Sequence, residues 1–286
     1  DLTIRYSNVI KEFPNHLGIH AGGVIISDQP IFAYTAQEYP PKGVPITQFS
    51  MQEAEDIGLH KFDVLSQRGL GKIRDAIILV KSNHNVDLSQ DINNIDLLKK
   101  DPGIIKQLKD GNTIGCFYVE SPGMRMLLTK LQTTTYTGLV AASSIIRPGV
   151  SKSGMMREYI ERARSPEKQK YVHPKLGELM AETYGVMVYQ EDVLKVAHFF
   201  AGLTLEEADV LRRGMSLKFR ERSDFDIIKE KFFENCAKKQ YKKELVVQVW
   251  TQIESFANYA FSKGHSASYA VESFQSLYIK AYYPLE

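Results

Sequence analysis

The chain has 286 residues, of which 43% are hydrophobic and 24% are charged, a composition typical of a globular protein with one or two hydrophobic cores. The formal net charge of +2 does not by itself indicate a nucleic-acid-binding protein, so such a role must come from local clusters. No apolar run approaches the roughly 20 residues of a membrane-spanning helix, and nothing predicts a signal peptide, so we expect a cytoplasmic location and no membrane partner. Cys116 and Cys236 lack the CxxC spacing of a zinc site, so we expect both to be reduced thiols.

The first 65 residues predict a small α+β layer. Residues 1–18 have the pattern of the end of a helix, and 51–56 predict a short helix. Glycine and β-branched runs and alternating polarity predict three short strands, over 21–27, 44–49 and 58–65. A loop rich in proline and tyrosine joins the first two strands.

From residue 66 onwards the pattern is mainly helical. Apolar spacing and glycine or proline boundaries predict helices over 69–83, 96–109, 121–131, 136–145, 153–164, 175–181, 189–201, 204–213, 224–239, 243–256 and 266–282. Residues 114–119 form an exception and predict a strand or a buried extended segment. The fold class is therefore α+β, with a small sheet followed by a large, mainly α-helical domain.

Asp63 is the first candidate site residue. It shares a face of the predicted third strand with Lys61 and lies between Phe62 and Val64. A carboxylate in such an apolar strand is costly to bury unless it binds something, and Mg²⁺ is one good partner. The alternative is a structural aspartate that is paired with Lys61 or caps a turn.

Two cationic segments are candidates for phosphate binding, because a guanidinium group binds phosphate oxygens in a bidentate manner. Arg147 follows two apolar residues in a Pro-Gly turn, and the alternative is a buried arginine that donates to backbone carbonyls. Arg212, Arg213 and Lys218 surround a predicted helix end, where the helix dipole favours cations in any case. The residues alone leave both interpretations open.

The segment 262–269 combines cations with a helix start. Lys263, His265 and the backbone N–H groups of a helix capped by Ser266 are able to converge on an anion. Tyr269 lies one turn further along this helix. The alternative is a capped helix whose histidine and tyrosine only pack against the core.

Three further polar features have a structural explanation that we favour. Gln190 and Glu191 follow an apolar, strand-like run and are interpreted as polar contacts within the core, with a nucleotide role for Gln190 as the alternative. His20 precedes a glycine pair and is expected to orient the backbone there, since no partner at ligand spacing indicates a metal site. Asp226 lies in an Asp-Phe-Asp sequence that reads as charge at a helix N-terminus.

A lysine-rich stretch is expected to be a solvated helix face. It contains Lys229, Lys231, Lys238, Lys239, Lys242 and Lys243. Any contact that it makes with DNA should involve phosphates and not bases, and should weaken steeply with salt.

Eight segments in order resemble the C-family replicative DNA polymerases of bacteria, the family of the DNA polymerase III alpha subunit. They span residues 20–26, 47–49, 58–65, 117–121, 147–149, 184–191, 208–215 and 256–284. The resemblance implies a nucleotidyltransferase-type palm followed by fingers. It assigns 1–18 to the end of a thumb or connector helix, 19–65 to the C-terminal part of the palm and 66–286 to the fingers.

The resemblance also implies roles for the candidate residues. Asp63, in Lys-Phe-Asp, corresponds to the third catalytic aspartate that holds two Mg²⁺ ions, and Lys61 to a charge partner for substrate phosphates. Contacts with the dNTP triphosphate or template are implied for the cations and the helix start, namely Arg147, Arg212, Arg213, Lys218, Lys263, His265 and Tyr269, with Gln190 and His20 as further candidates. Primer–template DNA and dNTPs are the implied partners, and the sliding clamp, clamp loader and proofreading exonuclease would contact regions outside this chain.

The chain departs from this family in one respect. The Pro-Asp-x-Asp-x-Asp motif that carries the other two aspartates is absent. We therefore interpret the chain as an internal piece of a longer polymerase and expect it to be inactive alone. A non-catalytic nucleic-acid-binding or assembly module that keeps the fingers fold is the alternative.

Overall fold

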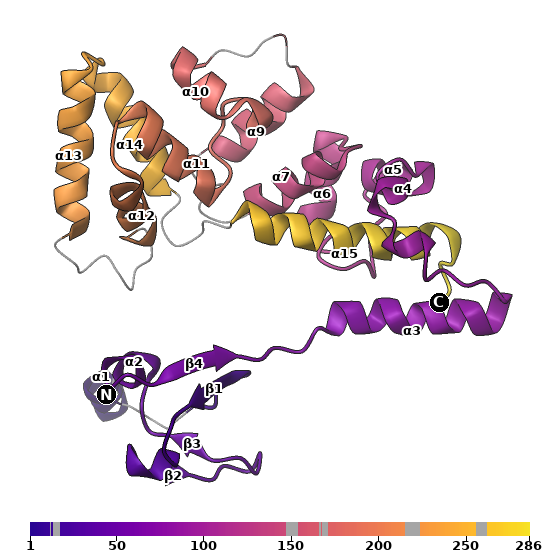
Figure 1. Ribbon diagram of the computed structural model, residues 1–286, viewed down its shortest axis with the longest axis horizontal. Coiled ribbons are helices and arrows are strands. Elements are labelled where there is room, and N and C mark those ends of the chain that lie inside the picture. Colours follow the sequence, from indigo (N-terminus) through magenta and orange to yellow (C-terminus); the bar gives the residue numbers. More distant parts are fainter. Residues whose placement is uncertain are drawn as a thin grey trace. The chain divides into compact units, whose positions relative to one another are not determined.

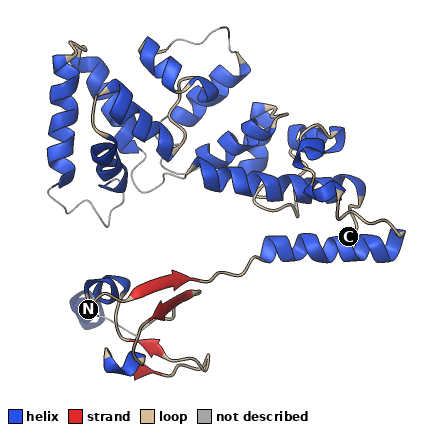
Figure 2. Cartoon of the chain, viewed as in Figure 1, coloured by secondary structure: helices blue, strands red, loops and turns tan. Residues whose placement is uncertain are grey.

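The computed structural model describes residues 1–11, 13, 18–146, 154–165, 167, 171–214, 224–255 and 262–286. The chain divides into two compact units, Asp1–Arg68 and Gly69–Glu286. The strands lie in the first unit, and the second is helical wherever it has regular structure (Figures 1 and 2). The predicted combination of small sheets and a large helical part is confirmed.

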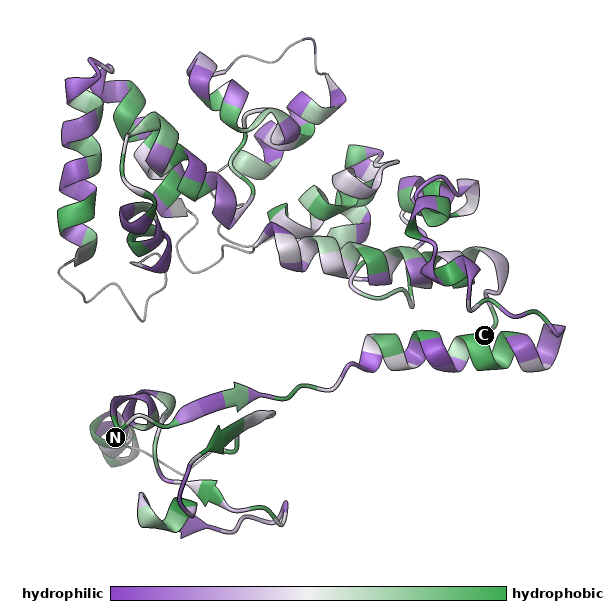
Figure 3. Ribbon diagram, in the orientation of Figure 1, coloured by the Kyte–Doolittle hydropathy of each residue, from purple (hydrophilic) through white to green (hydrophobic). Residues whose placement is uncertain are grey.

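The first unit contains two small antiparallel sheets. Its elements are α1 (Leu2–Ile10), β1 (Gly23–Ile26), η1 (Ile31–Ala33), β2 (Gln37–Glu38), β3 (Ile46–Thr47), α2 (Met51–Asp56) and β4 (His60–Asp63). Strand β1 pairs with β4, so that Gly23 lies opposite Asp63 and Ile25 opposite Lys61. Strand β2 pairs with β3. Figure 3 shows how strongly hydrophobic β1 is.

The expectation that the three predicted strands form one layer was wrong. The second predicted strand shortens to β3 and pairs with β2, which lies within the segment expected to be a loop. A two-residue strand leaves no periodic pattern in the sequence, and pairing between segments decides whether it exists. Helix α1 ends at Ile10, and residues 14–17 of the predicted helix end lie outside the described residues.

The glycine pair at the start of β1, Gly22 and Gly23, allows the two strands to approach. A Cβ atom on Gly22 would lie 2.4 Å from the carbonyl oxygen of Val64, and one on Gly23 would lie 2.6 Å from Cε of Lys61. The backbone N–H of Val64 also donates to the Gly22 oxygen over 2.7 Å. At Gly22 only glycine fits, because a larger residue would meet the Val64 backbone and separate β1 from β4.

The second unit is a set of helices, most of them short. Its helices are α3 (Arg68–His84, which begins at the unit boundary), η2 (Asp91–Asn93), α4 (Ile95–Leu98), α5 (Pro102–Asp110), α6 (Pro122–Leu131), α7 (Tyr136–Ile145), α9 (Met155–Arg164), α10 (Pro174–Leu179), η4 (Ala181–Thr183), α11 (Gln190–Lys195), η5 (Val196–Phe200), α12 (Leu205–Gly214), α13 (Asp224–Lys238), α14 (Lys243–Ser255) and α15 (Lys263–Tyr282). The predicted helix over 96–109 is split, because Asp101 caps a new helix that starts at Pro102. Within the described residues, no helix is both long and apolar enough to cross a membrane.

Helix α15 packs directly against α7 and α5 (Figure 1). Phe274 and Leu277 of α15 are fully buried in the main core. Tyr136 at the start of α7 donates to the carbonyl oxygen of Ala267 over 2.6 Å. These contacts fix the position of α15 within the second unit.

Two local predictions in the second unit were wrong. Residues 114–119 form turns, with Gly115 and Tyr118 in the left-handed region at φ 82° and 63°, so no strand is possible there. Helix α15 begins at Lys263 with Ser262 as its cap, whereas Ser266 is buried and shares a 2.6 Å hydrogen bond with Ser144. Ser266, which the sequence predicted as the helix cap, is therefore used in packing against α7.

Candidate functional site

Asp63 lies at the end of β4 and is more open than its apolar neighbours suggested. Its side chain is 49% exposed, which corrects the expectation of a buried carboxylate. Nζ of Lys61 donates to Oδ1 of Asp63 over 2.6 Å, and Lys61 itself is only 17% exposed. This hydrogen bond holds the pKa of the Asp63 carboxyl below its ordinary value, against a smaller opposing effect of desolvation. Asp63 is thus an ionised, accessible carboxylate.

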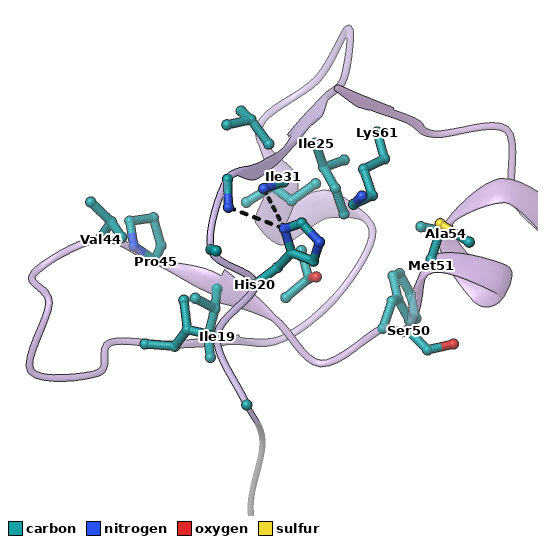
Figure 4. A pocket seen from close by; sticks show the side chains of 18 of the residues that line it. Ile19, His20, Ile25, Ile31, Val44, Pro45, Ser50, Met51, Ala54 and Lys61 are labelled. Carbon is teal, nitrogen blue, oxygen red and sulfur yellow. Dashed lines mark hydrogen bonds between the residues drawn. The ribbon is translucent and has the colours of Figure 1, made fainter. Parts of the chain in front are cut away.

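His20 organises the backbone beside Asp63. Its Nδ1 atom accepts hydrogen bonds from the N–H groups of Gly22 (3.1 Å) and Gly23 (2.6 Å), as the dashed lines in Figure 4 show. Because the Nδ1 lone pair accepts these N–H groups, Nδ1 does not at the same time donate to Asp63. The 3.7 Å between Nδ1 and Oδ1 of Asp63 is therefore proximity and not a hydrogen bond. His20 shapes the turn that brings β1 against β4.

A pocket of about 770 Å³ lies in the first unit and is lined in part by His20 and Lys61. Its wall is mostly aliphatic and aromatic, and Figure 4 shows Ile19, Ile25, Ile31 and Met51 around it. The polar part of the wall comes from His20, Lys61, Gln37, Lys42, Thr47 and Ser50.

Metal ligands are sparse in the part of the chain that the structure describes. No group of three or more His, Cys, Asp or Glu side chains comes together there to hold an ion. Asp63 can therefore contribute one carboxylate to a metal site, and further ligands would have to come from elsewhere.

In the second unit, Arg212 and Arg213 share one carboxylate. Nε and Nη2 of Arg212 both lie 2.8 Å from Oδ1 of Asp209, and Nε of Arg213 lies 2.9 Å from Oδ2. Nη1 of Arg212 also contacts Oε1 of Gln190 over 3.4 Å. The arginines occupy the last turn of α12, where the helix dipole adds to their stabilisation.

The start of α15 is likewise surrounded by acids. The backbone N–H of Lys263 lies 3.1 and 3.0 Å from the two carboxylate oxygens of Glu191. Nζ of Lys263 lies 2.5 Å from Oε2 of Glu182 and 5.5 Å from the ring centre of Tyr189. His265 Nδ1 shares a 2.7 Å hydrogen bond with the hydroxyl of Ser262. A protein carboxylate thus occupies the position that an anionic ligand would take.

Tyr269 belongs to an aromatic cluster one turn along α15. Its ring lies 4.8 Å from that of Tyr118 and meets Phe117 edge-on at 5.6 Å. The hydroxyl of Tyr118 is 3.5 Å from the carbonyl oxygen of Ser143. Tyr269 therefore packs against other aromatic side chains, as the structural alternative predicted for part of its contacts.

Gln190 and Glu191 connect the arginines at the end of α12 with the start of α15. They form the first turn of α11, and Gln190 contacts Arg212 of α12 while Glu191 contacts the start of α15. The structure therefore brings Arg212, Arg213 and Lys263 to one region of the second unit. Sequence reasoning missed Asp209 and Glu182. The spacing of Asp209 to the arginines at i+3 and i+4 was a signal that could have identified it, but Glu182 lies 81 residues from Lys263.

Some candidates lie outside this region or outside the described residues. Arg147 and Lys218 fall in segments that the structure does not describe. In the lysine-rich stretch, Lys239 donates to the carbonyl oxygen of Phe200 over 2.7 Å, and Lys229 pairs with Glu254 over 3.2 Å. Asp226 lies in the first turn of α13, which begins at Asp224.

Two protein-family models match adjacent parts of the chain. The model of the bacterial DNA polymerase III alpha NTPase domain matches residues 1–66, and that of the bacterial DNA polymerase III alpha subunit finger domain matches residues 69–240. The junction between them coincides with the division between the two units at Arg68.

Three relatives illustrate how far the similarity extends. The DNA polymerase III subunit alpha of Aquifex aeolicus is 37% identical over 278 residues, which is 97% of this chain and 23% of the relative. The subunit of the same name from Campylobacter jejuni is 34% identical, over 99% of this chain and 23% of the relative. The subunit from Bacillus subtilis is 34% identical, over 96% of this chain and 24% of the relative. The chain thus spans about a quarter of the length of these relatives.

Proposed function

The chain belongs to the bacterial DNA polymerase III alpha subunit family, and we propose that it forms the C-terminal part of the palm and the fingers of a DNA-directed DNA polymerase. The complete enzyme would add dNMP from a dNTP to a primer 3′ end opposite a template. We propose a cytoplasmic location for this reaction. The sliding clamp, the clamp loader and the proofreading exonuclease would bind to parts of the enzyme outside this chain.

The observation that carries this proposal is the joining of Arg212, Arg213 and Lys263 through Gln190 and Glu191. A dNTP is a polyanion, so its binding site must gather cations that come from different segments of the chain. The end of α12 and the start of α15 bring such cations together, and protein carboxylates pair with them in this structure. We assign Arg212, Arg213, Lys263, His265 and Tyr269 to the dNTP side of the site, together with Arg147 and Lys218 on the basis of family resemblance.

Asp63 fits a role as a magnesium ligand. Magnesium is commonly held by one or two carboxylates together with substrate phosphates, and Asp63 is ionised and half exposed. Two Mg²⁺ ions held there in the complete enzyme would supply positive charge to the attacking 3′ oxygen and the leaving pyrophosphate. Lys61 holds Oδ1 in a fixed orientation, and His20 holds the β1 turn against which Asp63 lies. Because Asp63 is a single carboxylate, we propose that the chain alone does not extend primers.

Binding of primer–template DNA at several salt concentrations tests the assignment of the arginines. We expect the chain to bind with an affinity that falls as salt rises, because phosphate contacts release counterions. The double variant Arg212→Ala/Arg213→Ala should bind roughly 10-fold more weakly, with a salt slope reduced by about 1–2. Fluorescence anisotropy with labelled DNA measures both quantities.

Arg157→Ala is the matched control for this experiment. Arg157 forms an exposed i, i+4 ion pair with Glu161 on α9, at 2.8 Å, and we assign it no substrate. Its removal should leave affinity and salt slope unchanged. Equal binding by the double variant and the unsubstituted chain would contradict the assignment, and primer extension by the chain alone would contradict its proposed inactivity.

A further inference from the structure

We propose that Asp209 is a positioning residue that holds Arg212 and Arg213 side by side as a ready-made receptor for a polyphosphate. The inference rests on the proposed function, in which these arginines bind the triphosphate of a dNTP. It adds a residue that carries negative charge and would not be sought at the binding site of a polyanion.

The geometry of the three side chains supports this role. Asp209 lies one turn before the arginines on α12 and reaches each with a different oxygen, Oδ1 to Arg212 and Oδ2 to Arg213. Arg212 is anchored a second time, because its Nη1 atom contacts Gln190 of α11. One carboxylate therefore sets the orientation of two guanidinium groups at once.

Two neighbouring arginines are stabilised side by side by a shared carboxylate. Two like charges in adjacent positions repel each other, and each long side chain has many rotamers that are lost when a ligand binds. A shared carboxylate offsets the repulsion and removes much of this freedom before binding, which is the general basis of preorganisation. Arg213 is bound to Asp209 through Nε and its side chain is 52% exposed, so the outer edge of its guanidinium group remains accessible to an incoming phosphate.

The alternative is that Asp209 is only a nearby negative charge that competes with phosphate for the arginines. The two roles predict opposite changes in the affinity for a polyanion when Asp209 is removed. Removal of a competing charge strengthens the binding of a polyanion, whereas removal of a positioning group weakens it. Neutralisation of Asp209 without loss of its shape therefore separates them.

The experiment uses the 286-residue chain and inorganic tripolyphosphate as the probe, at constant ionic strength, with isothermal titration calorimetry. We expect Asp209→Asn to weaken binding by roughly 5- to 10-fold, although it removes a negative charge. Asp209→Glu restores a carboxylate and should recover most of the affinity. Glu161→Gln is the matched control, since it breaks an arginine–carboxylate pair of the same kind on α9 and should leave affinity unchanged.

A second measurement reports on the arginines themselves. The Nε–H signals of Arg212 and Arg213 in ¹⁵N–¹H spectra should be resolved and slow to exchange in the unsubstituted chain, and should be lost in Asp209→Asn while the backbone spectrum is preserved. A preserved backbone spectrum excludes misfolding as the cause of weaker binding. Nε–H signals that do not respond to Asp209→Asn would overturn the inference.

The binding results separate this inference from the function on which it rests. If the unsubstituted chain binds tripolyphosphate and Asp209→Asn binds equally well or more tightly, Asp209 is not a positioning residue and the arginine assignment stands. If the unsubstituted chain does not bind tripolyphosphate, the assignment of the arginines to a triphosphate fails and the role of Asp209 fails with it.

Discussion

Glu272 is a buried acid in the middle of α15. Only 9% of the residue is exposed, and its Oε1 atom has no hydrogen-bond partner within the described structure. A Cβ atom on Gly69 would lie 1.7 Å from this oxygen, so the carboxyl group fills the space beside the start of α3. Burial raises the pKa of Glu272 above its ordinary value of 4.5. Its charge is therefore a source of instability in the second unit.

Glu272→Gln should change how stability depends on pH. Because the pKa is raised on folding, the folded state binds more protons than the unfolded state between pH 4.5 and the folded-state pKa, and stability falls as pH rises through that window. The variant loses this dependence and should be more stable than the unsubstituted chain at pH 7.5, by roughly 1 kcal/mol, with the difference shrinking towards pH 4.5. Urea unfolding followed by circular dichroism at several pH values measures it.

The control for this prediction is Glu230→Gln, which removes an exposed carboxylate from α13 in the same unit. It should leave the pH profile of stability close to that of the unsubstituted chain. A Glu272→Gln variant with an unchanged profile would mean that the carboxyl group finds a partner in solution.

At the scale of elements, the pairing of β1 with β4 depends on glycine. Gly22 faces backbone atoms of Val64, which cannot move away as the end of a side chain can. The same pairing places Asp63 opposite Gly23 and beside His20. The orientation of the candidate metal ligand therefore depends on the absence of a side chain on the neighbouring strand.

Gly22→Ala should weaken this strand pair. The added methyl group would meet the Val64 oxygen at 2.4 Å, and the cost of such overpacking is about 1–3 kcal/mol. We expect the amide of Val64, which donates to Gly22, to lose its protection from hydrogen exchange. Gly18→Ala is the matched control, because a Cβ atom there meets nothing within 4 Å, and equal protection in both variants would contradict the prediction.

Prediction from sequence was most accurate for elements whose signals are local. The expected ranges for α2 and α7 agree with the structure to the residue, and that for α6 to within one residue. Apolar periodicity and end signals such as Ser121 and Thr135 lie within a few residues of the helices that they define. Strand β2 and the turns over 114–119 were missed, since both depend on contacts with other segments.

For the molecule as a whole, buried apolar side chains are distributed very unevenly. Among the described residues of the first unit, Ala54 and Leu59 are the buried hydrophobic ones, whereas both hydrophobic core clusters lie in the second unit. Burial of apolar area is the main favourable contribution to folding. The first unit therefore has little of its own to stabilise it.

We expect hydrogen exchange to reflect this difference. Amides of α7 and α15 should exchange several orders of magnitude more slowly than those of β1 and β4, because local stability follows local burial. Phe274→Ala removes a fully buried ring and should lower the stability of the second unit by about 3–5 kcal/mol, which mass spectrometry detects as faster exchange there. Val247→Ala, at an exposed position of α14, is the control, and similar protection of both units in the unsubstituted chain would contradict the expectation.

The sequence by itself determined most of the helices, the strand that carries Asp63 and the family to which the chain belongs, because these depend on residues close together in the chain or on short motifs in a fixed order. Tertiary structure decided which side chains meet. It left the Asp63 side chain half exposed, paired Ser266 of α15 with Ser144 of α7, and set Glu182 against Lys263 across 81 residues. Ion pairs and buried hydrogen bonds between distant segments have no periodicity in the sequence, so only the packed helices define them.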